Sequence, residues 1–89
     1  MQQFAGTDDF YGFIDLLAKR LSDEGLADHA AKLHTLIHDV AWTSGSELLG
    51  ELGAELKRLQ ELHEHHLPAD VAEAVTRSLT FVRLYWPDL

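Results

Sequence analysis

The chain has 89 residues, of which 15 are acidic and 7 are basic, and it contains no cysteine. Its net charge of -8 with neutral histidines excludes nucleic acid and anionic membrane surfaces as natural partners, because both would repel it. No stretch approaches the roughly 20 apolar residues that span a bilayer, and the first residues lack the pattern of a signal peptide. We therefore expect a single acidic domain over residues 1–89, located in the cytoplasm.

Two predicted helices open the chain, over about residues 8–24 and 27–41. Thr7 is a good N-cap residue for the first helix, since its hydroxyl can accept a hydrogen bond from a first-turn N–H group. Gly25 separates the two helices, because glycine adopts the left-handed conformation that ends many helices. So short a connection predicts an antiparallel hairpin. The residues expected to face the core recur at helical spacing and are Phe10, Phe13, Ile14, Leu17, Leu21, Leu26, Ala30, Leu33, Leu36, Ile37 and Val40.

The longest predicted helix spans about residues 45–66. Ser44 and Glu47 have the spacing of a capping box. Gly50 and Gly53 each cost about 1 kcal/mol relative to alanine inside a helix. They lie on or near the side opposite the apolar stripe, where small residues would let another helix approach closely; simple tolerance of glycine is the alternative. The apolar stripe itself consists of Leu48, Leu49, Leu52, Leu56, Leu59 and Leu62.

The fourth predicted helix spans about residues 69–85, after Pro68 and with Asp70 in its first turn. Its wide apolar arc includes Val71, Ala72, Val75, Leu79, Val82, Tyr85 and Trp86. Four helices with short connections predict an all-α, antiparallel, up-down-up-down four-helix bundle. Because the arc of the fourth helix is so wide, completion of the core by dimerisation is the alternative.

The six histidines are the first candidate source of chemistry. His34 and His38 are four residues apart, so both could reach one metal ion. His29 and His63 are expected to meet when the bundle forms, with a third ligand available from Asp28 or Glu64. His63 also projects onto the leucine stripe, which favours a partly buried, neutral, hydrogen-bonded imidazole. We therefore predict no metal and no cofactor.

Acidic residues form a row along the third predicted helix. Glu47, Glu51 and Glu55 recur every four residues, and like charges at this spacing repel each other. Within the helix only Arg58 is placed to offset them, so a basic protein partner would gain by binding this row. Trp42, just before the helix, would add an aromatic contact. A solvated face paired with arginines of the fourth helix is the alternative.

These patterns favour a small acidic protein-interaction or regulatory module that is not an enzyme. The chain has no cysteine nucleophile, no strand-turn-helix elbow around a serine and no glycine-rich phosphate loop. The predicted partner-binding residues are Glu47, Glu51, Glu55 and Trp42. A homo-oligomeric structural protein is the first alternative, and a bundle that binds a metal or a small ligand is the second. The aromatic stretch that ends in Trp86-Pro87 is expected either to close the core or to join the binding surface.

Overall fold

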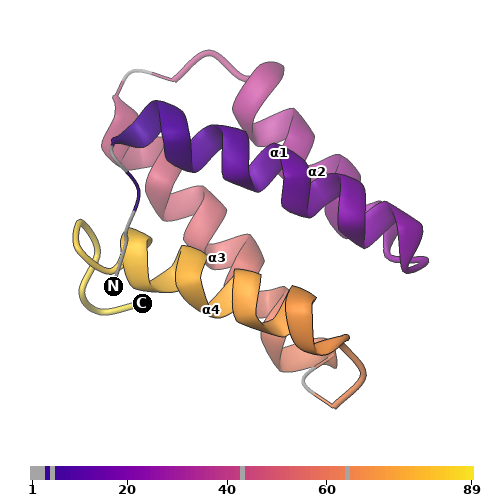
Figure 1. The fold of residues 1–89 in the computed structure, drawn as a ribbon. Coiled ribbons are helices and arrows are strands. Elements are labelled where there is room, and N and C mark those ends of the chain that lie inside the picture. The colour runs from indigo at the N-terminus through magenta and orange to yellow at the C-terminus, as the bar shows by residue number, and fades with distance from the viewer. Residues whose placement is uncertain (1–3, 5, 43, 64) are drawn as a thin grey trace.

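A computed structural model of the protein describes four α-helices. They are α1 (Thr7–Asp23), α2 (Ala27–His38), α3 (Gly45–His63) and α4 (Ala69–Val82). Helices α1 and α2 form one hairpin, α3 and α4 form another, and the two hairpins pack against each other (Figure 1). The predicted all-α fold is confirmed. The description covers residues 4, 6–42, 44–63 and 65–89.

Each helix has two neighbours in the bundle. Helix α1 packs mainly on α2 and α4, and α3 packs mainly on the same two helices. Arg20, near the end of α1, donates through Nε to the Asp70 carboxylate at the start of α4, at 2.9 Å. His29, near the start of α2, bonds to Glu55 in the second half of α3. Whether two copies of the bundle associate stays a prediction.

Most of the core is built from the predicted apolar stripes, but Val40, Leu62, Tyr85 and Trp86 are exposed. Leu52, Leu56 and Leu59 of α3 are completely buried, as the stripe predicted. Leu62 continues the same stripe in sequence, yet it is 63% exposed and lines a hollow beside His29 of α2. Val40 is also exposed, because α2 ends before reaching it.

The connections follow the predicted turn chemistry in part. Gly25 has φ +81°, and the Leu26 N–H bonds to the Leu21 carbonyl at 2.9 Å, which is the hydrogen bond of a Schellman ending. The Glu47 N–H donates to Ser44 Oγ at 3.3 Å, as half of the predicted capping box requires. Thr7 is not the N-cap that the sequence indicated. Gly6, with an extended backbone, occupies that position, so no side chain caps the start of α1.

Helices α2 and α4 both end earlier than the sequence predicted, and a tryptophan follows each of them. Helix α2 ends at His38, and the Leu36 carbonyl accepts from the Trp42 indole Nε1 at 2.6 Å. In a longer helix that carbonyl would accept from the Val40 N–H instead. Helix α4 ends at Val82, after which tight turns carry the chain to Trp86 and back toward α3. The predicted end of α3 at residue 66 also shortens, to His63.

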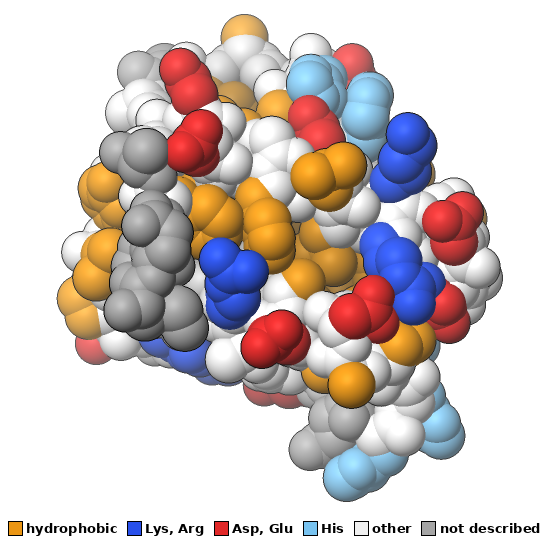
Figure 2. All heavy atoms as spheres, in the orientation of Figure 1, with side chains coloured by type: hydrophobic (Ala, Val, Ile, Leu, Met, Phe, Trp, Pro, Cys, Tyr) orange, Lys and Arg blue, Asp and Glu red, His pale blue; other side chains and the backbone are white. Residues whose placement is uncertain are grey.

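The surface carries both charge signs in mixture. On the face shown in Figure 2, acidic and basic side chains are interspersed around a band of hydrophobic side chains. The net charge of -8 is therefore not concentrated into one patch on this face. None of the helices in the described part of the chain combines the length and the apolar character needed to cross a bilayer.

Candidate functional site

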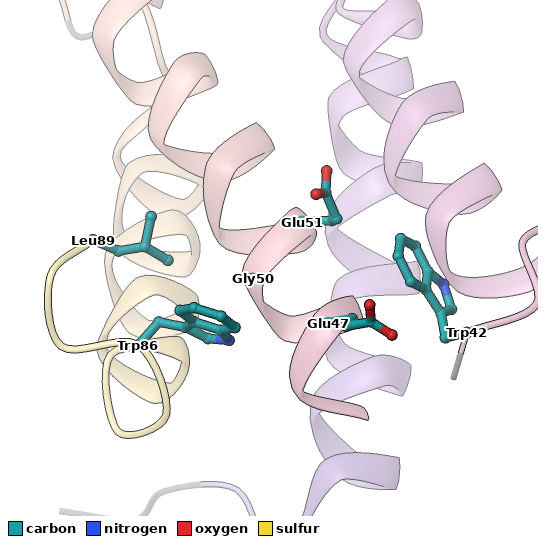
Figure 3. Close-up of a pocket in the computed structure, with 6 residues that line it drawn as sticks. All are labelled: Trp42, Glu47, Gly50, Glu51, Trp86 and Leu89. Carbon is teal, nitrogen blue, oxygen red and sulfur yellow. The ribbon is translucent and has the colours of Figure 1, made fainter. Parts of the chain in front are cut away.

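A shallow groove of about 300 Å³ crosses the first turns of α3. Figure 3 shows an indole on each side of this part of the helix, with the two glutamates on the Trp42 side and Leu89 on the Trp86 side. The groove is assembled from the connection after α2, the N-terminal half of α3 and the turns after α4. Its lining residues are Trp42, Glu47, Gly50, Glu51, Trp86 and Leu89.

Trp86 is held against the backbone of α3. Its Nε1 donates to the Ser46 carbonyl at 2.7 Å, and its ring lies over Gly50. A Cβ atom at position 50 would come within 3.1 Å of the indole Cε2, which is closer than side chains ordinarily pack. An alanine here would force the ring to shift by a few tenths of an ångström, so glycine favours this close contact. Trp86 is 43% exposed and lines the groove, so it presents aromatic surface there.

Trp42 is fixed in a similar way on the other side. Its Nε1 donates to the Leu36 carbonyl, and the residue is half-buried against the core. Both indole N–H groups therefore bond to backbone carbonyls within the chain. What the two rings offer to a ligand is their apolar and π surface rather than a hydrogen-bond donor.

Two of the three predicted glutamates line the groove. Glu47 and Glu51 are both exposed, one helical turn apart, and they line the groove together with Trp42. Glu55 lies elsewhere. It is only 7% exposed, and its Oε2 accepts from His29 Nδ1 at 2.8 Å. The acidic row is thus two residues long at the surface, and Glu55 is directed toward α2.

The second glycine of α3 explains how the groove is closed at one end. A Cβ atom on Gly53 would lie 2.8 Å from Val82 Cγ1 and would also collide with the Leu89 side chain. Leu89 is anchored by its carbonyl, which accepts from Arg83 Nε at 2.7 Å. The small-residue side of α3 is therefore covered by the chain's own segment after α4. The close approach that the two glycines predicted occurs within one molecule.

The histidine pairs form separate clusters. His34 and His38 have ring centroids 4.5 Å apart, and His38 Nε2 lies 2.9 Å from the Asp15 carboxylate. His29 and His63 meet across α2 and α3, as the sequence predicted, with their Nε2 atoms 3.3 Å apart. Among the described residues, no three histidine or carboxylate side chains are grouped closely enough to share a metal ion. Glu64, named as a possible third ligand, lies outside those residues.

Sequence reasoning did not identify Gly50 and Leu89 as lining residues. For Trp86 it left two positions open, one closing the core and one in the binding surface. The glycines of α3 had indicated a close approach, and a large aromatic followed the last helix. Taken together, these two features predict an aromatic ring lying on a glycine. Trp86 Nε1 and the Ser46 carbonyl, 40 positions apart, complete that contact.

Comparisons of the chain with known protein families, with curated proteins and with solved structures found no match. The function is therefore argued from the groove and its residues.

Proposed function

We propose that the chain is a non-enzymatic protein-interaction module whose groove takes a lysine or arginine side chain of a partner protein. The observation that carries this proposal is the pairing of two fixed indole rings with two carboxylates over one surface of α3. A cation is the ligand that both kinds of group attract. Aromatic faces bind ammonium and guanidinium groups through the ring quadrupole, and carboxylates bind them through charge.

The hydrogen bonds of the two indoles narrow the choice of ligand. Because Trp42 Nε1 and Trp86 Nε1 already donate to carbonyls, a ligand that needs a donor gains nothing from them. An anionic ligand would also be repelled by Glu47 and Glu51. Both rings are held before any ligand arrives, so less conformational entropy is lost on binding than with free side chains.

The size of the groove favours a side chain over a free metabolite. Its volume of about 300 Å³ is at the lower limit for small-molecule sites. An aliphatic stem would lie along the exposed surface of an indole ring while its charged end reaches Glu51. An exposed cation–π contact contributes about 0.5–1 kcal/mol and an exposed ion pair about as much. One side chain would therefore bind weakly, and contacts around the groove must supply the rest of the affinity.

Tryptophan fluorescence gives a direct test of binding, because the chain contains two tryptophans and both line the groove. The probe is a set of capped pentapeptides that are glycine except for a central arginine, lysine, glutamine or glutamate. We expect the tryptophan emission to change and to saturate with the arginine or lysine peptide. The glutamine and glutamate peptides should leave it unchanged.

A matched pair of variants separates the groove from general charge attraction. Glu51→Gln should weaken the basic peptide several-fold, because it removes a groove carboxylate. Glu61→Gln removes an exposed carboxylate from the same helix outside the groove and should have no effect. Equal losses in the two variants, or equal binding of the glutamate peptide, would contradict the proposal. Glu55 is left unchanged, because it is buried.

A second copy of the chain is one protein that could supply the basic side chain. Light scattering over a hundredfold concentration range distinguishes this case from a different partner. A constant monomer mass would assign the groove to another protein. A concentration-dependent dimer that disappears in Glu51→Gln would identify the partner as the chain itself.

A further inference from the structure

A second cluster of polar side chains lies at the other end of α3, away from the groove. His29 of α2 contacts both Glu55 and His63 of α3, through opposite sides of its ring. The side chains of His29 and Glu55 are only 14% and 8% exposed. His63 is half-buried, and its ring stands at 89° to that of His29. The packing of α2 on α3 therefore positions the two imidazole rings relative to each other.

The hydrogen bond to Glu55 determines which nitrogen of His29 is available. A carboxylate only accepts hydrogen bonds, so His29 Nδ1 must carry the proton. In neutral His29 the lone pair is then on Nε2, which faces Nε2 of His63. A buried carboxylate that fixes the ring and tautomer of a histidine in this way is the usual outer partner of a metal-binding imidazole.

The distance between the two facing nitrogens matches a metal site. The Nε2 atoms lie 3.3 Å apart. Two imidazole nitrogens bound to one tetrahedral zinc ion at about 2.0–2.1 Å are separated by about 3.3–3.4 Å. We propose that His29 and His63 bind a divalent transition-metal ion, with Zn²⁺ as the reference ion, and that Glu55 orients His29 for it.

Two protein nitrogens leave the remaining coordination positions to water. A hollow of about 260 Å³, lined by His29, His63, Asp28 and the turn at Gly25, opens beside the two rings and has room for such ligands. The Asp28 carboxylate adds negative charge to the same hollow. A site with two protein ligands binds more weakly than the closed four-ligand sites of structural zinc. It is separate from the groove and does not depend on the proposed function.

The first test is calorimetric titration of the intact chain with zinc chloride at neutral pH. We expect one zinc ion per chain and an increase in the melting temperature. His63→Asn should weaken zinc binding at least about tenfold, because it removes one of two protein ligands. The matched controls are His38→Asn and the double variant His65→Asn/His66→Asn, which should bind zinc like the unchanged chain.

The second measurement uses the unchanged chain, so it does not depend on how a variant folds. Histidine ¹⁵N spectra report each ring nitrogen separately. We expect zinc to shift Nε2 of His29 and of His63 while Nδ1 of His29 stays protonated. The proposal is overturned if these two nitrogens do not respond to zinc. It is also overturned if zinc binding is lost in the His38 or His65/His66 variants but kept in His63→Asn.

Discussion

The two halves of α3 carry glutamates at the same four-residue spacing but place them in different surroundings. Glu51, in the first half, is exposed in a groove between two indoles, whereas Glu55, in the second half, is buried against His29 of α2. The helix presents both carboxylates toward the same side. The two glutamates differ in the segment that lies beside them. The segment containing Trp42 lies beside Glu51 and leaves a groove, whereas α2 covers Glu55. Sequence spacing alone therefore does not separate a binding residue from a structural one.

The largest expected difference between the two halves is in stability. Glu55→Ala leaves the buried His29 Nδ1–H without a partner, and an unsatisfied buried polar group costs about 1–3 kcal/mol. Glu51→Ala, one turn earlier, should change the free energy of unfolding by no more than about 0.5 kcal/mol. Chemical denaturation followed by circular dichroism measures both values. Similar values for the two variants would mean that the two carboxylates are not in different environments.

The two glycines of α3 give the next largest effect. In Gly53→Ala the new methyl group must displace Val82 and Leu89, and overpacking costs about 1–3 kcal/mol. Helix propensity returns about 1 kcal/mol, so we expect a net loss of stability of up to about 2 kcal/mol. Gly50→Ala faces only the partly exposed Trp86 ring, which is able to move.

Gly50→Ala should therefore keep the stability of the unchanged chain while weakening its binding of the arginine peptide. Displacement of the ring stretches the bond from Trp86 Nε1 to the Ser46 carbonyl, which would also alter the tryptophan emission. Denaturation and peptide titration of the two glycine variants give the comparison. A stable Gly53→Ala, or a Gly50→Ala with unchanged peptide binding, would contradict this division between core and groove.

The smallest effect is expected at an exposed ion pair, which serves as the reference for the buried Glu55–His29 contact. The hydrogen bond from Arg20, more than its charge alone, lowers the pKa of the Asp70 carboxyl. A lowered pKa in the folded state stabilises the protein above the unfolded-state pKa, and this contribution is lost as the pH falls through the folded-state value.

Asp70→Asn should therefore lower the melting temperature slightly at neutral pH and make its decrease in acid shallower. Melting curves from neutral to strongly acidic pH measure both effects, and Asp23→Asn, which changes another exposed carboxylate, is the control. An acid dependence identical to that of the unchanged chain would show that the pair with Arg20 contributes nothing.

Most of the fold could be predicted from the sequence, because the apolar spacing and the glycine turn act locally. The leucines of α3 and the ending at Gly25 were identified for this reason. The predictions were wrong where a contact between residues distant in sequence determines burial or the end of a helix. Leu62 continues the stripe but leaves the core, because the neighbouring helix does not cover it. Helix α2 ends before the predicted residue, and the Trp42 indole bonds to the carbonyl of Leu36 near its end.

The candidate site was predicted in part, for the same reason. Trp42, Glu47 and Glu51 were identified from their place around the start of α3, which is local information. Glu55 lies outside the groove, and its burial against His29, 26 positions earlier, could not be read from the spacing. For Trp86 the sequence left core closure and the binding surface both open, because its ring reaches α3 only after the chain turns back beyond α4.

At Gly50 the groove depends on the absence of a Cβ atom, which would meet the Trp86 ring. Alanine scanning, the usual way to map a binding surface, shortens every other lining side chain but lengthens this one. A loss of peptide affinity in Gly50→Ala would then result from a filled space, whereas a loss in Glu51→Ala would result from a missing contact. A mutational map of this surface therefore has to treat added and removed atoms as opposite experiments, and a scan that omits glycines would overlook the position that seats Trp86.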